Sequence, residues 1–254
     1  MLSSASTAEW YPVPIWLSAP QPFLFSSLTG GIASFFMIAA IYLLFRTYQN
    51  RSAMGLSFYG FLCISIASIH SPVMLFYIPF FWIMMAINLR SLNIRTFGAT
   101  ILGLLLPYGF VAVGLFYHQQ MEWFESHFSS LITFSFHGTY QSIPASIWIY
   151  IMFITVIALI GIIHYLNISY QYKIRIRLLF ESFITLDIVT FVFLILQPQH
   201  YDMLLRIIIA NTAPLIGHFI ALTHTRFTNI SFYLLIITTL ILTAYNLWTY
   251  SFSF

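Results

Sequence analysis

Charged residues are scarce in this sequence. Nine Lys or Arg and six Asp or Glu occur among 254 residues, whereas 60% of the residues are hydrophobic. Ordinary soluble domains carry about 25% charged residues. So few charges cannot cover a surface that faces water, which excludes a soluble globular fold. A bilayer removes that requirement, because side chains that face lipid are apolar.

Cysteine and catalytic signature motifs are also missing. The single Cys63 excludes an intrachain disulfide, a CxxC redox pair and a cysteine-rich metal cluster. No Walker, GxSxG or GxGxxG motif occurs, which argues against an ATP-driven pump or an ordinary hydrolase. No basic run is dense enough to predict a nucleic-acid partner. Residues 1–26 lack a basic start and contain four prolines, so we expect an outer-side segment and no cleavable signal peptide.

Long apolar runs dominate the rest of the chain. A spanning helix needs about 20 apolar residues. The run over 55–89 is too long for one span, and we expect a turn at His70–Pro72, since Pro72 suits the first turn of a new helix. The sequence thus predicts an all-α transmembrane bundle in 27–250, with about eight spanning helices and an outer loop over 118–142. These helices are expected at about 27–45, 55–70, 72–89, 97–117, 143–165, 178–196, 203–222 and 229–250.

The placement of basic residues supports this count. If the chain crosses the membrane eight times, eight of the nine basic residues fall on one side, as the positive-inside bias requires. Seven crossings would divide the basic residues between the two sides of the membrane. Both termini then lie on the outer side of the membrane if the crossings number eight. The sequence predicts a multi-pass protein of a bacterial inner membrane, whose first partner is the lipid bilayer. The residues on the inner side are Arg46, Arg51, Arg90, Arg95, Lys173, Arg175, Arg177 and Arg226.

A few polar residues lie within the predicted spans. Asp187 is near the centre of its helix, and Arg206 and Asn211 on the next helix are placed to reach it. This cluster is either an interhelical clamp or a functional group, such as a proton relay or a substrate-binding site. Glu181 is expected to pair with Arg177, four residues earlier. Gly30-Gly31 and Gly98/Gly103 are expected to permit close helix packing.

Two further groups suggest chemistry more weakly. Glu122 and Glu125 in the outer loop form either a general acid/base pair or part of an amphipathic helix on the membrane surface. The histidines show no HExxH or similar ligand spacing. His218 has no evident partner at its depth, as a haem clamp would need. We therefore expect no metal and no cofactor.

Two stretches resemble a known family. They are FLCISIASIHSPVMLFYIPFFWI with SLNIRTFGATILGLLLPYGF, in 58–117, and RIIIANTAPLIGHFIALTHTRFTNISFYLLIITTLILTAYNLW, in 203–248. Together they resemble a family of multi-pass inner-membrane proteins of Bacteroidetes that is defined by a domain of unknown function. The resemblance covers about two-thirds of the chain. It implies a location but no activity, and it implies that this chain is either a short member of that family or one with a late start.

A second likeness concerns the polyprenyl-phosphate-sugar glycosyltransferases of GT-C type. A short helix, an outer turn ending in Pro, an apolar helix, basic residues and a GLLLP helix are similar to part of that superfamily. An acidic residue in the first outer loop is the catalytic base there, whereas the corresponding segment here holds only Glu9. The leading interpretation is a non-enzymatic accessory or scaffold subunit that binds other membrane-protein subunits. A GT-C-like transferase and a transporter with a midplane Asp/Arg site are the alternatives.

Overall fold

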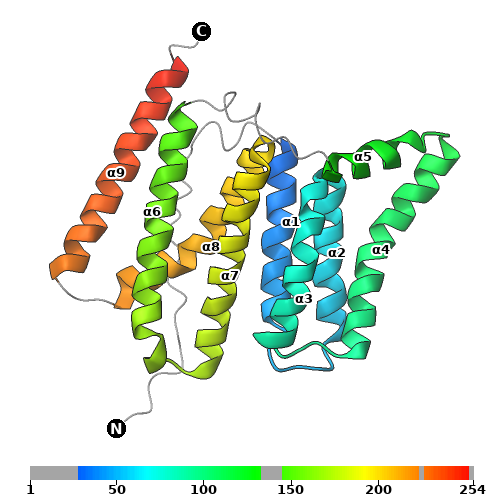
Figure 1. Cartoon of the computed structure of the whole chain (residues 1–254), viewed down its shortest axis with the longest axis horizontal. Coiled ribbons are helices and arrows are strands. Elements are labelled where there is room, and N and C mark those ends of the chain that lie inside the picture. The colour runs from blue at the N-terminus through cyan, green and yellow to red at the C-terminus, as the bar shows by residue number, and fades with distance from the viewer. Residues whose placement is uncertain (1–27, 133–144, 223–225, 252–254) are drawn as a thin grey trace.

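The computed structural model describes residues 28–132, 145–222 and 226–251, which form nine α-helices and no strand (Figure 1). This confirms the all-α class. The N-terminal segment 1–26 and part of the outer loop lie outside the described residues. Short 3-10 helices occur at Pro72–Phe76, Ser169–Gln171 and Pro198–His200. The α-helices are α1 (Leu28–Phe45), α2 (Met54–His70), α3 (Tyr77–Ile87), α4 (Ile94–Tyr117), α5 (Glu122–Ile132), α6 (Ala145–Ile168), α7 (Ile174–Leu196), α8 (Tyr201–Leu222) and α9 (Arg226–Ser251).

Four segments are long and apolar enough to cross a membrane, judged by length and composition. They are Ile94–Tyr117, Ile147–Gln171, Ile174–Leu196 and Pro198–Ile220. Four shorter apolar helices accompany them at Gly30–Phe45, Met54–His70, Pro72–Ile87 and Ile230–Tyr245. Helices of this composition are typical of a membrane protein, because their exposed side chains are largely apolar.

The turn that the sequence predicts near residue 71 is present. Helix α2 ends at His70, and Pro72 opens the following 3-10 helix, where its missing N–H leaves no hydrogen bond unmade. The two short helices then lie side by side. The ring of Phe61 on α2 is 6.4 Å from that of Phe81 and 6.2 Å from that of Trp82, both on α3.

The helices form a row with two flanking members. Helix α2 packs against α1 and α4, and α8 packs against α7, α6 and α1. Among the four long candidate spans, α8 is the most buried and α4 the least. Helices α4 and α9 stand at opposite flanks of the bundle, and α5 runs from the end of α4 back toward α2 and α3 (Figure 1).

Close helix approach depends on particular glycines. A Cβ on Gly103 of α4 would lie 2.5 Å from the carbonyl oxygen of Phe58 on α2, so only hydrogen fits there. A Cβ on Gly31 of α1 would lie 2.9 Å from the guanidinium of Arg206. The predicted close helix packing is confirmed at Gly103, which meets backbone, whereas at Gly31 the near atom is the end of a flexible side chain. The prediction is wrong at Gly98, where an added Cβ would meet nothing within 4 Å.

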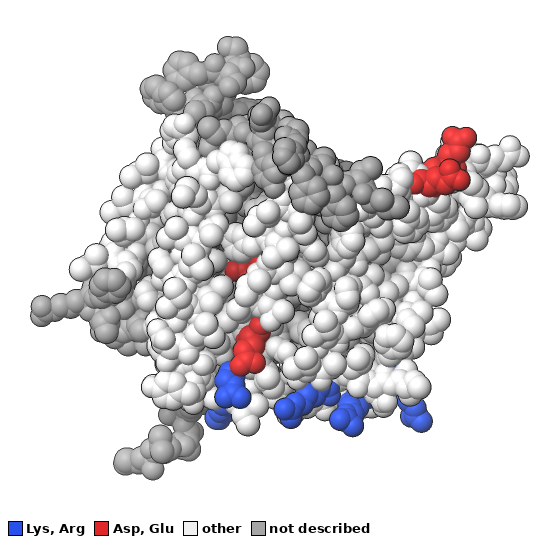
Figure 2. All heavy atoms as spheres, in the orientation of Figure 1, with Lys and Arg blue, Asp and Glu red and all other residues white. Residues whose placement is uncertain are grey.

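Charged side chains mark the two ends of the bundle. Lys and Arg gather along one end of the face in view, whereas acidic side chains lie at the opposite end beside α5, near the middle of the face and against one of the basic groups (Figure 2). The first end is where α1 joins α2, where α3 joins α4 and where α6 joins α7 (Figure 1). We call it the basic end. Its basic residues in those connections and helix starts are Arg46, Arg51, Arg90, Arg95, Lys173, Arg175 and Arg177.

Candidate functional site

Asp187 is the one acidic residue that is fully buried in the described part of the chain. It lies on α7, and both of its carboxylate oxygens accept from the hydroxyl of Thr212 on α8, at 3.2 Å each. A charged group at this depth is costly unless it has polar partners. The contact therefore joins α7 to α8 at the point where burial makes an unpaired carboxylate most unfavourable.

A second buried contact lies close by. The phenol of Tyr77, at the start of α3, donates to Thr190 Oγ1 on α7 at 2.9 Å, and the ring lies within electrostatic range of Asp187. Next to Thr212, the amide of Asn211 is buried and makes no hydrogen bond within the described residues. Three helices thus contribute polar groups to one buried region.

Arg206 makes its ion pair elsewhere. Its guanidinium Nη2 lies 3.0 Å from Oδ1 of Asp202, one turn earlier on α8, and the same nitrogen is 3.1 Å from Oδ2. The predicted cluster of Asp187, Arg206 and Asn211 stays a prediction as a functional unit. The structure adds Thr212 and Asp202 as the hydrogen-bonding partners of its charged members.

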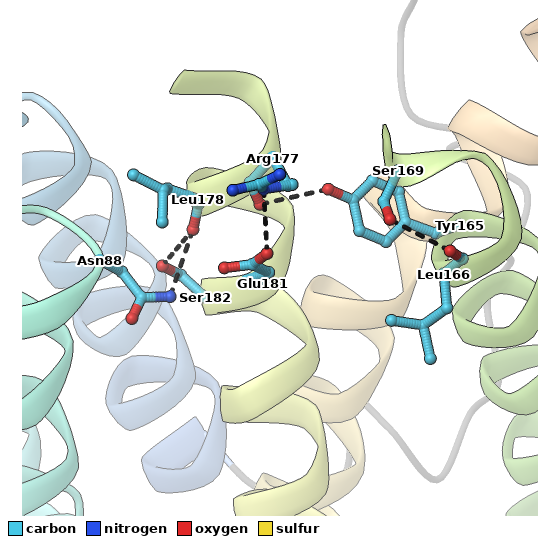
Figure 3. Close-up of polar contacts among 8 residues, drawn as sticks. All are labelled: Asn88, Tyr165, Leu166, Ser169, Arg177, Leu178, Glu181 and Ser182. Atoms are coloured by element: carbon cyan, nitrogen blue, oxygen red, sulfur yellow. Dashed lines mark hydrogen bonds and ion pairs between the residues drawn. The ribbon is translucent and has the colours of Figure 1, made fainter. Parts of the chain in front are cut away.

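Polar contacts also fix the start of α7, at the basic end (Figure 3). Tyr165 on α6 donates its phenol hydrogen to the carbonyl of Arg177 at 3.2 Å, and Asn88 after α3 donates to the carbonyl of Leu178 at 3.3 Å. The predicted pair of Arg177 and Glu181 is confirmed, with Nε and Oε1 3.5 Å apart. Both side chains are about two-fifths exposed, so this pair contributes little stability.

The outer-loop acids lie on α5, which confirms a helix at this position. Glu122 and Glu125 fall in its first turn and are exposed. Acidic side chains favour that turn because the helix dipole is positive there. The opposite face carries His127, whose ring stacks on Trp123 with centroids 4.4 Å apart. The geometry is that of an amphipathic surface helix with its carboxylates turned outward.

His127 connects α5 to the bundle. Its Nε2 lies 3.4 Å from the phenol oxygen of Tyr108 on α4, which is itself 2.8 Å from Ser68 Oγ on α2. Burial lowers the pKa of His127 below its usual value, and a hydrogen bond involving the backbone of Ser68 opposes that shift. The neutral ring is therefore the form that the docked helix favours.

The expectation that His218 has no partner at its depth is wrong. The ring of His164 on α6 lies beside it, with centroids 6.1 Å apart. Sequence reasoning missed this pair because it did not consider His164. One signal could have found it: each histidine lies four residues before the end of its helix, at Ile168 and Leu222, and α6 and α8 run in the same direction.

Known proteins give no further guide to these residues. No family model, no curated protein and no solved structure matches the chain.

Proposed function

We propose that this protein is an eight-crossing protein of a bacterial inner membrane and serves as a non-enzymatic scaffold or accessory subunit. The crossing number rests on the eight apolar helices, four long and four shorter. The basic end then faces the cytoplasm by the positive-inside rule. Helix α1 begins and α9 ends at the other end of the bundle (Figure 1), which supports outer termini.

One observation carries the scaffold assignment: the buried polar side chains of different helices bond to one another. Asp187 binds Thr212, Tyr77 binds Thr190, and Ser68 binds Tyr108. Each contact joins two helices, and hydrogen bonds of this kind stabilise packing within a membrane. In this proposal the carboxylate of Asp187 serves as a clamp that holds α7 against α8.

The experiment is mass spectrometry of the protein purified in mild detergent from its native membrane at native expression levels. We expect a membrane-protein partner in fixed stoichiometry. A bound polyprenyl-phosphate lipid without a protein partner would contradict the scaffold proposal and favour the GT-C-like alternative. In that case Glu122→Gln or Glu125→Gln should abolish transfer, although both carboxylates are exposed and turned away from the bundle.

A transporter is the second candidate, favoured by the burial of Asp187 and by the buried amide of Asn211, which makes no hydrogen bond within the described residues. Intramembrane ionisable residues commonly mark substrate or proton pathways. Asp187→Asn separates the two functions, because an amide oxygen still accepts from Thr212 but the side chain no longer carries a proton. A scaffold should keep its partner in this variant. A transporter should remain folded and lose uptake.

A further inference from the structure

The rings of His164, which is partly buried, and His218, which is buried, lie beside each other between α6 and α8. Only 8% of His218 is exposed, and neither of its ring nitrogens has a hydrogen-bond partner within the described residues. Nε2 of His164 is likewise buried without a partner there. Three buried nitrogens of two neighbouring imidazole rings therefore have no hydrogen-bond partner within the described residues, although buried polar atoms are almost always hydrogen-bonded.

The described surroundings of these nitrogens are mostly aromatic. Aromatic rings enclose His218, with centroids 5.7 Å away for Tyr165, 5.0 Å for Tyr172 and 4.9 Å for Phe180. The phenol hydrogen of Tyr165 is donated to the carbonyl of Arg177. The surroundings of the imidazole are apolar, and its lone pair is free within the described residues. Such a site is suited to a ligand that binds directly to the imidazole nitrogens.

The separation of the rings fits a single ion between them. A metal–nitrogen bond of about 2.0–2.1 Å, added to a ring radius of about 1.1 Å, places two imidazoles on opposite sides of an ion with centroids about 6 Å apart. A tetrahedral angle at the ion would bring them to about 5 Å. The observed 6.1 Å matches the opposite-sided arrangement.

The number of available ligands narrows the choice of metal ion. Within the described chain, no third His, Cys, Asp or Glu joins the pair to form a larger metal-binding group. Zinc in proteins almost always takes four ligands in a tetrahedron, whereas imidazole also suits copper. Copper(I) is stable with two nitrogen ligands in a near-linear arrangement.

Haem, which also takes ligands from opposite sides, does not fit between these helices. A Cβ on Gly161 would lie 3.1 Å from Cβ of Leu215, so α6 and α8 almost touch one turn away from the two histidines. This close approach leaves room for a single ion and none for a macrocycle. We propose that His164 and His218 bind one copper(I) ion between α6 and α8.

The ion can reach this site from the basic end. His164 is only partly buried, and four residues separate it from the end of α6, about 6 Å along the helix axis. The site is independent of the scaffold assignment, because neither histidine takes part in the Asp187 contacts. Copper binding can therefore succeed or fail without deciding the scaffold proposal.

The test uses the full chain in detergent, with Cys63→Ser in every sample so that no thiol binds the metal. Copper(I) is titrated without oxygen against a chromophoric copper(I) chelator. We expect one tightly bound ion per chain, with X-ray absorption showing two nitrogen neighbours. Removing the hydrogen-bond partner of a metal ligand weakens metal binding by about 10–100-fold. His164→Gln removes a ligand itself, so we expect it to weaken binding by more than about 100-fold.

Two exposed histidines serve as controls. His70→Gln and His118→Gln should bind copper(I) as the parent does. His164→Gln is the main variant because its partly exposed position tolerates substitution, and copper(I) should raise the unfolding temperature of the parent but not of this variant. Failure of the parent to compete with the chelator would overturn the proposal. Undiminished binding by His164→Gln, or tighter binding of zinc than of copper(I), would do the same.

Discussion

Several buried polar side chains of this protein form hydrogen bonds with side chains on other helices. Asp187 receives both of its hydrogen bonds from one hydroxyl, that of Thr212, and both side chains are fully buried. Hydrogen bonds between membrane helices contribute about 0.6 kcal/mol on average and about 1.7 kcal/mol at most. The contact is therefore modest in energy, but losing the donor would leave a carboxyl group buried without a partner.

We expect Thr212→Val to lower the free energy of unfolding by about 1–2 kcal/mol, since it removes the donor and leaves the acceptor buried. Unfolding in mixed detergent micelles, followed by circular dichroism, measures this change. Thr185→Val is the matched control. Thr185 is exposed on the same helix as Asp187 and bonds only the carbonyl of Glu181. Equal stability of the two variants would disprove the clamp.

A second residue-scale prediction concerns helix contact at glycine. Gly103→Ala should destabilise the protein by about 1–3 kcal/mol, the usual cost of overpacking, because the added methyl group meets the rigid backbone of Phe58. Gly109→Ala on the same helix should be neutral or slightly stabilising, since nothing lies within 4 Å and Ala favours helix. Thermal unfolding of both variants distinguishes them. If Gly103→Ala unfolded at the same temperature as the parent protein, α4 and α2 would be able to move apart freely.

Whole elements differ in how firmly they are held. Helix α8 packs against α1, α6 and α7, whereas α5 is attached along one face to α2, α4 and the 3-10 helix after α2. The ring of Phe128 stacks on Tyr108 with centroids 5.8 Å apart, and His127 contacts the same phenol. An element that is held by one aromatic face and one imidazole should open before the bundle does.

Acidification should loosen α5. The docked helix lowers the pKa of His127, so it binds fewer protons than the free helix does near the usual value of about 6.5. Stability of docking is thus fully present above that value and is lost as the pH falls below it. Hydrogen exchange of 122–132, expressed as a protection factor relative to the intrinsic rate at each pH, should show less protection at pH 5.5 than at pH 7.5. His127→Gln should remove this difference, and an unchanged pH effect would refute the assignment.

At the scale of the whole molecule, the uneven distribution of charge between the two ends supports the proposed orientation in the membrane. Seven basic residues lie at the basic end, and the first turn of α5 carries Glu122 and Glu125 at the other. In a bilayer, basic loops stay on the cytoplasmic side. The proposed eight crossings place α5 on the outer surface and both termini on the same side as α5.

Cysteine labelling tests this orientation. In a Cys63→Ser background, Ser126→Cys on α5 should react with a membrane-impermeant maleimide in intact spheroplasts. Ser52→Cys and Lys173→Cys, at exposed positions of the basic end, should react only after the membrane is opened. Labelling of all three in intact spheroplasts would contradict the positive-inside arrangement. Labelling of Ser52→Cys and Lys173→Cys, without labelling of Ser126→Cys, would show that the orientation is reversed.

The sequence by itself determined that the chain is helical and apolar, and it located the helix ends near Phe45, His70, Tyr117 and Leu196. These features are local: they follow from runs of apolar residues about 20 long, from Pro72 and from charges at the ends. The pair of Arg177 and Glu181 was predictable for the same reason, because residues four apart on a helix are neighbours.

Only the tertiary structure decided which residues of different helices meet. A helix that is apolar on every side gives no pattern to show which face turns inward, so rotation and pairing are set by packing. Thr212 rather than a distant arginine therefore bonds Asp187, Gly103 and not Gly98 contacts α2, and His164 lies beside His218. These contacts depend on the positions of whole helices, which single-residue spacing does not encode.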